Sequence, residues 1–456
     1  MVLSGIYLVW QFIDVPKQST PLTTDDARPV ALNFWGVYDD VSLFQPIIDS
    51  YEATHPGVTV NYTQKEASLY EFASLNLLAS QDGPDIWLIP QDWLPKHHDK
   101  LAIVPEGLLA SQDAVPTKKR LFAKKIKPSP NVTLFNERYT TVTQTENIVK
   151  GAVYTLPIAA DTLGLFANTS LLQQKSIPRL PQTWDDTIAA SNKLRERNGV
   201  NLTKPGLAIG SSTNVSRADE ILATLLLQNH TPMTDSQKTE ARYNETISKA
   251  TGEAFQPGLA ALDFYTSFAS PSKENYAWTK DQSQDFELFM AGKLPLLIDY
   301  SYRIRDITET NPTFPLATGI MPQIRDTSDP ITLASPLVVG VPSVSKHPVE
   351  AWNFIQFLTN KDNNLRYALA SGRPPARRDL LQSSSFSPFL APFLAQIDTP
   401  KGTPAVASLW YRNDIKASKT VFHQAIDATL SGEPLSVVID RLTKQSTHIL
   451  RGEAYE

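Results

Sequence analysis

The sequence predicts an α/β protein, and its first ninety residues carry the prediction. Residues 31–36 and 85–90 are short apolar runs typical of buried strands, and residues 58–60 alternate with the period of a strand. Helical periodicity separates these runs at 41–55 and 70–80. Short connections between strand, helix and strand are typical of a parallel sheet.

The two helices are amphipathic by the spacing of their apolar residues. The first is expected to end at the His-Pro-Gly sequence that starts at His55, because proline and glycine interrupt helices. Its predicted buried face consists of Leu43, Phe44, Ile47, Ile48 and Tyr51. The predicted buried face of the second consists of Phe72, Leu75, Leu78 and Ala79.

Further buried elements are predicted along the rest of the chain. Thr183 can cap a helix whose first turn holds Asp185 and Asp186, so this acid pair is interpreted as structural rather than catalytic. The predicted strands are 153–167 and 294–298, and the predicted helices are 221–227, 258–268, 351–358 and two within 413–450.

Composition excludes several classes of function. The chain has 456 residues, which suggests about three domains or two large ones. Lysine and arginine (42) minus aspartate and glutamate (47) give a net charge of −5, which argues against nucleic acid as the main partner. The absence of cysteine excludes thiol catalysis, disulfides, cysteine-ligated zinc and a lipid-modified N-terminal cysteine.

No familiar catalytic motif is present. Phosphate-binding loops, dinucleotide fingerprints, zinc-protease motifs and nucleophile elbows are all absent. His97 and His98 have no third ligand at metal spacing, and the basic run at 118–127 is interpreted as a solvated helix face. These absences favour a binding protein, without cofactor or metal, over an enzyme. A catalytic pair of carboxylates, as in a glycosidase, remains an alternative because the chain has 47 acidic residues.

The N-terminus is unusual. Residues 1–13 are uncharged and mostly apolar, but too few to span a bilayer, and residues 14–29 have the composition of a linker. One interpretation is the remnant of a membrane anchor or signal that starts further upstream. The other is a buried N-terminal strand or helix. No other stretch approaches 18 apolar residues.

Several motifs, in the same order, resemble one family. The chain is similar to the extracellular solute-binding proteins of ABC importers, in the sugar-binding group that includes maltose-binding protein. The resemblance covers about 32–442. It rests on Phe-Trp-Gly at 34–36, HPGVTV at 55–60, Gly-Pro-Asp-Ile at 83–86, GAVYTLPIAADTLGLFAN at 151–168, Pro-x-Thr-Trp-Asp at 181–185, FMAGKLPLLIDYSY at 289–302, KHPVEAWNFIQFLT at 346–359 and SGRPPARRDL at 371–380.

The resemblance implies a periplasmic-binding-protein fold, with two α/β lobes and a ligand cleft at the hinge between them. It implies a monomeric, non-catalytic, extracytoplasmic receptor that delivers a sugar or oligosaccharide to a membrane permease. The same fold could instead bind a polyamine, peptide or polyol phosphate, and a secreted polysaccharide-active enzyme is a further alternative. The expected divisions are an N-terminal tether at 1–27, lobe one at 28–158 plus 316–370, and lobe two at 159–315 plus 371–456.

Two residues stand out as candidate ligand contacts. Sugar binding needs flat aromatic faces and a few carboxylates or amides that accept hydrogen bonds from hydroxyl groups. Asp161 is the only charged residue in 152–167 and matches an acid of the family's hinge motif. The alternative is a buried aspartate held by backbone amides. Trp410 matches a tryptophan that stacks on sugar in the family, and its alternative is core packing.

The resemblance also implies contacts after the strands. Asp92 and Trp93 follow the third strand, where the family lines its cleft, and Trp93 replaces a basic residue of the maltose binder. Further candidates are Tyr38, Asp39 or Asp40 after the first strand, Tyr300 and Tyr302 after strand 294–298, and, as weaker candidates, Thr213 and Asn214. Trp278 is expected to be exposed because its neighbours are polar. Arg373 is expected either to reach the cleft or to form an inter-lobe salt bridge.

Overall fold

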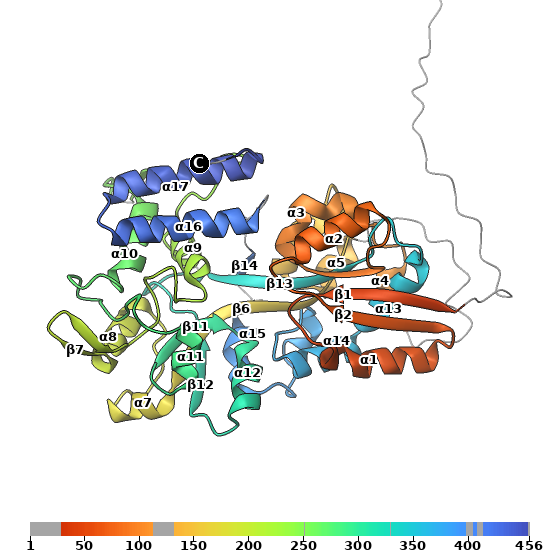
Figure 1. The fold of residues 1–456 in the computed structure, drawn as a ribbon, viewed down its shortest axis with the longest axis horizontal. Helices are drawn as coiled ribbons and strands as arrows, with labels where there is room; N and C mark the ends of the chain where they lie inside the picture. Colours follow the sequence, from red (N-terminus) through yellow and green to blue (C-terminus); the bar gives the residue numbers. More distant parts are fainter. Residues whose placement is uncertain are drawn as a thin grey trace, which may run out of the picture.

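The protein has two α/β bodies joined by extended segments (Figure 1). The computed structural model describes residues 29–112, 132–249, 251–328, 330–397, 405–407 and 414–454. Lobe one is the body that contains the N-terminal strand β1 (Val30–Gly36), and lobe two is the body that contains α9 (Ala218–Gln228) and the C-terminal helices. The two-lobed α/β fold predicted from the sequence is confirmed.

The sheet of lobe one is built on the strands predicted from the first ninety residues. β1 pairs in parallel with β2 (Val58–Gln64) and with β3 (Ile86–Pro90). On the other side of β3 lies β13 (Thr332–Gly340), which runs antiparallel to it. The sheet is therefore mixed, because a strand from late in the chain completes what local sequence predicts as a parallel unit.

The first predicted helix is confirmed in extent and face. α1 (Val41–Thr54) buries the five residues that its apolar spacing indicates. In α2 (Tyr70–Ala79), by contrast, the side chain of Phe72 is 68% exposed, and the helix buries Tyr70, Ser74 and Leu78. The predicted inward positions of Phe72 and Ala79 are wrong, because apolar residues lie on every side of α2 and their spacing cannot identify the packed face.

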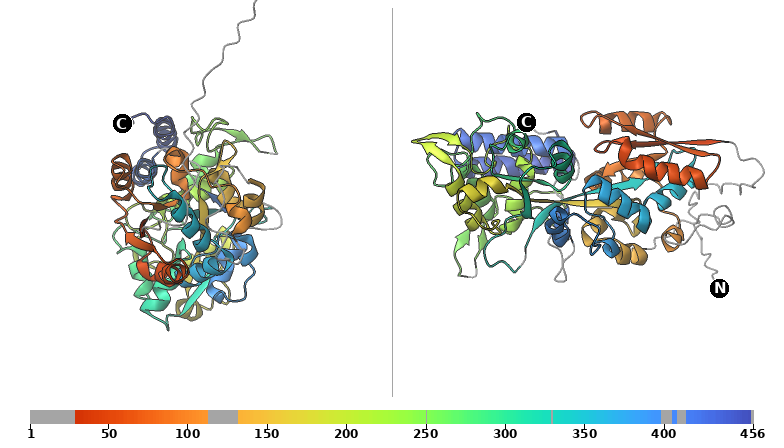
Figure 2. Two further views of the ribbon diagram at one scale, coloured as in Figure 1. Left: turned by 90° about the vertical axis from the view of Figure 1, so that its right-hand side faces the viewer. Right: turned by 90° about the horizontal axis from the view of Figure 1, so that it is seen from below.

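A single long strand crosses from lobe one into lobe two. β6 (Leu156–Asn168) is buried over its whole length, as the apolar run predicts. Its first half pairs with β13, and its second half lies between β11 (Leu296–Tyr300) and β12 (Leu316–Ile320). The two lobes thus share β6, and Figure 2 shows extended segments running between the two lobes.

Each lobe has its own hydrophobic core, and the cores meet on the crossing strands. Along β6, Ala160 belongs to the core of lobe one and Leu163 to that of lobe two. Along β13, the change lies between Leu333 and Ala334. We therefore propose that the chain returns to lobe one within β13. The boundary expected at residue 316 is too early, because Leu316 packs in the core of lobe two.

The third connection also lies later than expected. Ala376 packs in the core of lobe one, and Phe393 in that of lobe two. We propose that this connection lies between these two residues rather than at 371; Ile397, at the end of α15, packs again in the core of lobe one. Packing decides these boundaries, and the apolar pattern of a continuous chain does not mark them.

The remaining helices and strands cover the two sheets. In lobe one they are α3 (Leu94–His97), α4 (Leu108–Ser111), α5 (Val132–Arg138), α6 (Thr141–Asn147), β4 (Ile148–Val149), β5 (Ala152–Val153), α13 (Pro348–Leu358) and α14 (Lys361–Ser371). In lobe two they are α7 (Thr169–Gln174), α8 (Trp184–Leu194), β7 (Glu196–Asn198), β8 (Asn201–Lys204), β9 (Ile247–Ser248), β10 (Ala254–Phe255), α10 (Pro257–Ser267), α11 (Asp285–Met290), α12 (Arg303–Thr310), α15 (Ala391–Ile397), α16 (Ile415–Leu430) and α17 (Leu435–Arg451). β14 (Ala405–Ala407) pairs with β13.

The helix start predicted at Thr183 is confirmed. The Thr183 hydroxyl accepts the amide of Asp186, as a helix cap does. Asp185 and Asp186 both accept hydrogen bonds from Arg325, at 2.8 and 3.0 Å. This ion pairing agrees with their interpretation as structural acids.

Two predicted segments lie outside the described residues. They are the N-terminal tether at 1–27 and the basic run at 118–127. Within the ranges that the structure describes, no helix is both long and apolar enough to cross a membrane.

Candidate functional site

The candidate site lies where the crossing strand β6 meets the ends of β1 and β11. Asp161, in the middle of β6, is 1% exposed. Its carboxylate accepts the amides of Thr162, Ser301 and Tyr302 at 2.8 to 3.2 Å, and Arg373 at 3.3 Å. Burial raises the pKa of Asp161, and Arg373 and the amides oppose the rise. This geometry is the buried-aspartate alternative, so a direct ligand contact by Asp161 stays a prediction.

Arg373 joins several segments through one guanidinium group. It follows α14 and is 7% exposed. One nitrogen contacts Asp161, and another lies 3.3 Å from Asp39 in the loop after β1. Asp39 also accepts the hydroxyl of Tyr367 at 2.6 Å. Burial lowers the pKa of Arg373, but the carboxylates outweigh it and raise the pKa overall. The geometry matches the salt-bridge interpretation of Arg373.

A second charged group lies at the end of β11. Asp299 is fully buried and accepts hydrogen bonds from Arg217 at 2.7 Å and from Arg303 at 2.9 Å. Burial opposes its ionisation, but the two arginines together lower the pKa of Asp299. Arg217 also contacts Glu220, at 3.3 Å. The positive charge of Arg217 is thus shared between two carboxylates.

The two tyrosines predicted after this strand differ in role. The hydroxyl of Tyr300 donates to Glu220 at 2.9 Å, and its side chain is buried. Tyr302 is half-buried, and its hydroxyl accepts from Arg217. The guanidinium of Arg373 lies 4.7 Å from the centre of the Tyr302 ring. Of the two, Tyr302 therefore retains a surface that a ligand could cover.

Tyr38, in the loop after β1, is an exposed aromatic of lobe one. Its side chain is 52% exposed, yet its phenol is so closely surrounded that desolvation, with the charge of Asp92, raises its pKa to about 12. Arg217 and Lys419, both from lobe two, act in the opposite direction. Tyr38 therefore faces charged groups of the other lobe, as expected for a residue between two lobes.

Asp92 and Trp93 follow β3 as predicted. Both are half-buried and belong to the short 3-10 helix Gln91–Trp93. The Trp93 ring packs against Tyr70 and Trp87, with centroid distances of 5.5 and 5.9 Å. Trp93 thus extends an aromatic cluster of lobe one. Part of its side chain is exposed, and the ligand contact expected of it stays a prediction.

Trp278 is placed differently from its prediction. It is 0% exposed, and its indole N–H donates to Asn214 at 2.9 Å and to Ser211 at 3.2 Å. The expected exposure of Trp278 is wrong, because Ser211 and Asn214, both more than 60 residues away in sequence, supply hydrogen-bond partners for a buried indole. The side-chain oxygen of Asn214 accepts one of these hydrogen bonds and is thus engaged within the protein. Trp410 lies outside the described residues.

Several charged residues of this site, among them Arg217, Glu220 and Lys419, are missing from the sequence predictions. Arg217 and Glu220 stand at the start of α9, and Lys419 lies on α16, 3.8 Å from Asp219. The negative charge of Glu220, with that of Asp219, raises the pKa of Lys419. Nothing in the sequence around Lys419 distinguishes it from other surface lysines, since only the packing of α16 on α9 brings it to the site.

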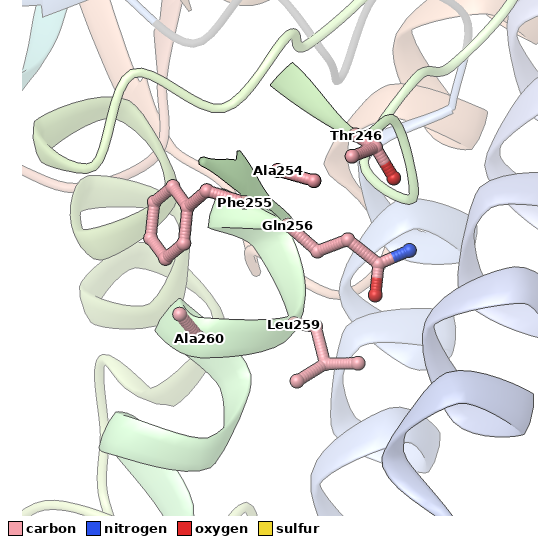
Figure 3. A pocket seen from close by; sticks show the side chains of 6 residues that line it. All are labelled: Thr246, Ala254, Phe255, Gln256, Leu259 and Ala260. Carbon is pink, nitrogen blue, oxygen red and sulfur yellow. The ribbon is translucent and has the colours of Figure 1, made fainter. Parts of the chain in front are cut away.

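Other features of the described residues do not join this site. A pocket of about 400 Å³ in lobe two is lined by Thr246, Ala254, Phe255, Gln256, Leu259 and Ala260 (Figure 3). It contains no charged side chain and none of the predicted residues. Over the ranges that the structure describes, no three histidine, aspartate or glutamate side chains form a group that could hold a metal ion.

Comparison with known proteins decides the family. A family model described as bacterial extracellular solute-binding protein matches residues 46–389. The chain belongs to this family of bacterial extracellular solute-binding proteins. Among its relatives, a maltotriose-binding protein of Pyrococcus abyssi is 21% identical over 75% of this chain and 65% of its own length. A binding protein of Brucella abortus is 20% identical over 80% of both chains.

Solved structures agree with the fold of this solute-binding protein. A cyclic alpha-maltosyl-1,6-maltose binding protein from Arthrobacter globiformis superposes with a TM-score of 0.69 and 18% identity. The match covers 93% of this chain and all of that one. The sugar-binding protein MalE of Xanthomonas citri gives a TM-score of 0.71 at 15% identity, over 93% and 98% of the two chains. The resemblance predicted from the sequence motifs is thereby confirmed.

Proposed function

We propose that this solute-binding protein is the extracytoplasmic receptor of an ABC importer and that it captures a sugar or oligosaccharide by closure of its two lobes. The family match supports solute binding. The position of Tyr38 and Tyr302, one from each lobe and both with exposed ring surface, supports a ligand with flat apolar faces. The protein would act as a monomer, held at the membrane by its N-terminal segment, and would release its ligand chemically unchanged.

The pairing of cations argues against an anionic ligand. Within the described part of the site, Arg217 is paired with Asp299 and Glu220, and Lys419 with Asp219. Arg373 is likewise paired with both Asp39 and Asp161. A polyol phosphate would need surplus cations and would therefore have to break existing ion pairs. Sugar hydroxyl groups can instead add hydrogen bonds to side chains that are already paired.

A thermal-shift screen tests the substrate class. Maltotriose, mannobiose and a panel of neutral oligosaccharides form one arm, and spermidine, glycerol phosphate and tripeptides form the other. A ligand that binds only the folded state adds ~2.7 kcal/mol of stability at a hundredfold excess over its Kd. We expect a concentration-dependent rise in Tm with at least one neutral sugar.

The screen also separates the alternatives. A rise with spermidine or glycerol phosphate alone would contradict the sugar assignment. Recovery of the bound oligosaccharide after prolonged incubation distinguishes receptor from enzyme, because a receptor returns it intact. Cleavage at a steady rate would instead indicate a pair of catalytic carboxylates roughly 5–9.5 Å apart.

Tyr38 offers a direct test of the site. Tyr38→Ala is expected to weaken binding of the sugar found in the screen about tenfold, or ~1.4 kcal/mol, because an aromatic face covers the apolar side of a sugar ring. The Tm of the ligand-free protein should stay within a degree or so of wild type, since half of the side chain is already exposed. Affinity is measured by isothermal titration calorimetry.

Phe72→Ala is the matched control for Tyr38→Ala. Phe72 is also an exposed aromatic of lobe one, at 68%, but it lies on α2 outside the site. Its replacement should leave affinity unchanged. Equal affinity for Tyr38→Ala and wild type would remove Tyr38 from the site.

A further inference from the structure

Two arginines hold the loop that carries Tyr38, and one of them comes from lobe two. Asp40, two residues after Tyr38, caps α1 of lobe one. Its carboxylate accepts a hydrogen bond of 2.8 Å from Arg305, which lies on α12 of lobe two. Asp39 contacts Arg373, which follows α14 and precedes the third connection between the lobes. Because both acids adjoin Tyr38, its position depends in part on a group that lobe one does not contain.

The same network reaches the loop that carries Tyr302. Arg373 binds Asp161 as well as Asp39, and Asp161 in turn accepts the amide of Tyr302. The hydroxyl of the intervening Ser301 donates to the carbonyl of Gly372 at 2.9 Å. The loops after β1 and β11 are therefore connected through a few buried contacts at the crossing strand β6.

We infer that Arg305 and Arg373 are positioning residues that connect the Tyr38–Asp40 loop of lobe one to the Tyr302 loop of lobe two and so set the separation of the lobes at the site. The inference rests on the proposed function only in taking the ligand to lie between these tyrosines. Neither arginine needs to touch the ligand for this role.

The contacts of Arg373 and the Asp40–Arg305 pair differ in their burial. Asp39, Asp161 and Arg373 are all more than nine-tenths buried. Asp40 and Arg305 are partly exposed, with side chains 43% and 23% accessible. Exposed ion pairs are weak, so the Asp40–Arg305 pair suits a role in shifting an equilibrium between lobe arrangements rather than in locking one.

The charge of the exposed pair persists over the relevant pH range. The hydroxyl of Ser42 and the guanidinium of Arg305 lower the pKa of Asp40 to about 2. A carboxylate with a lowered pKa keeps its pairing above its ordinary pKa and loses it as the pH falls through the lowered value. The pair is therefore intact at neutral pH. Of the other groups nearby, Glu309 also contacts Arg305, at 3.1 Å.

Distance measurement between the lobes tests the inference without any ligand. The chain has no cysteine, so nitroxide labels at Ser80→Cys on lobe one and Gln424→Cys on α16 of lobe two attach only there. Both sites are exposed; Ser80 directly follows α2, and α2 and α16 lie on the same side of the crossing strands (Figure 1). In this labelled protein, Arg305→Gln and Asp40→Asn each remove the ion pair. Asparagine retains the capping role at position 40.

We expect either substitution to change the ratio of lobe arrangements roughly two- to fivefold in favour of longer distances. The double variant should shift no further than each single one, because both remove the same contact. Glu309→Gln is the matched control: it removes the other partner of Arg305 and should leave the distances as in wild type. High salt should reproduce part of the shift, since exposed pairs are screened.

An unchanged distance distribution in both Arg305→Gln and Asp40→Asn would overturn the inference, as would an equal shift in Glu309→Gln. These outcomes are independent of sugar binding. If the distances shift but no sugar binds, the positioning role stands and the proposed function fails. If a sugar binds but the distances do not respond, the proposed function stands and the positioning role fails.

Discussion

Replacing Arg373 with methionine is expected to lower the free energy of unfolding by about 3–5 kcal/mol. The substitution leaves the carboxylates of Asp39 and Asp161 buried without their shared cation. Removing one partner of a buried ionic group costs more than the group contributes, because the remaining charges stay desolvated. The loss is measured by urea denaturation at neutral pH.

Arg366→Met is the control for this prediction. Arg366 lies on the same helix, α14, but its side chain is exposed. Its replacement should change stability by no more than about 0.5 kcal/mol. If the two variants lose the same stability, the buried cluster contributes nothing specific to the fold.

Replacing Trp278 with alanine is expected to cost about 3–5 kcal/mol of stability. The indole is fully buried in the core of lobe two, and its N–H satisfies Asn214 and Ser211. Truncation therefore leaves both a cavity and buried polar atoms without their donor. Calorimetric or denaturant unfolding of the purified variant measures the loss.

Trp278→Phe refines the test, because phenylalanine keeps a buried aromatic ring while it loses the N–H and part of the indole volume. We expect a smaller loss for this variant, of about 1–3 kcal/mol, from the unsatisfied acceptor. A Trp278→Ala protein of normal stability that no longer binds sugar would contradict the core position and favour the stacking role expected from the sequence.

Strand and helix predictions succeeded where a local pattern was sufficient. The face of α1 follows directly from the spacing of Leu43, Phe44, Ile47, Ile48 and Tyr51. The start of α8 follows from Thr183, whose hydroxyl can reach only the next few amides. In both cases the interaction lies within a few residues of the chain, so the sequence contains the whole explanation.

Predictions of exposure failed where the partner is distant in sequence. Phe72 lies on a helix that is apolar on every side, and only packing selects Tyr70 and Leu78 for burial. Trp278 has polar neighbours, but Asn214, 64 residues away, receives its N–H inside the core. Residue type and spacing indicate what can be buried, and tertiary contacts decide what is.

The candidate site shows the same division. Tyr38, Asp39, Asp161, Tyr302 and Arg373 were predicted as ligand contacts from their positions after strands or within a family motif, and the structure places them close together. Their roles did not follow from the sequence. Whether a carboxylate faces a ligand or a protein donor depends on groups that arrive from other parts of the chain.

The sequence by itself determined the α/β class, because apolar periodicity is a local property. Its ordered motifs carry the family resemblance, and that resemblance implied the two-lobed fold. Only the tertiary structure decided that β6 is shared by both lobes and that Asp161 is enclosed by amides and Arg373. The same holds for the contact of Asp40 with Arg305, which lie 265 residues apart. Such contacts follow from how the chain returns between its lobes, and no short stretch of sequence encodes that path.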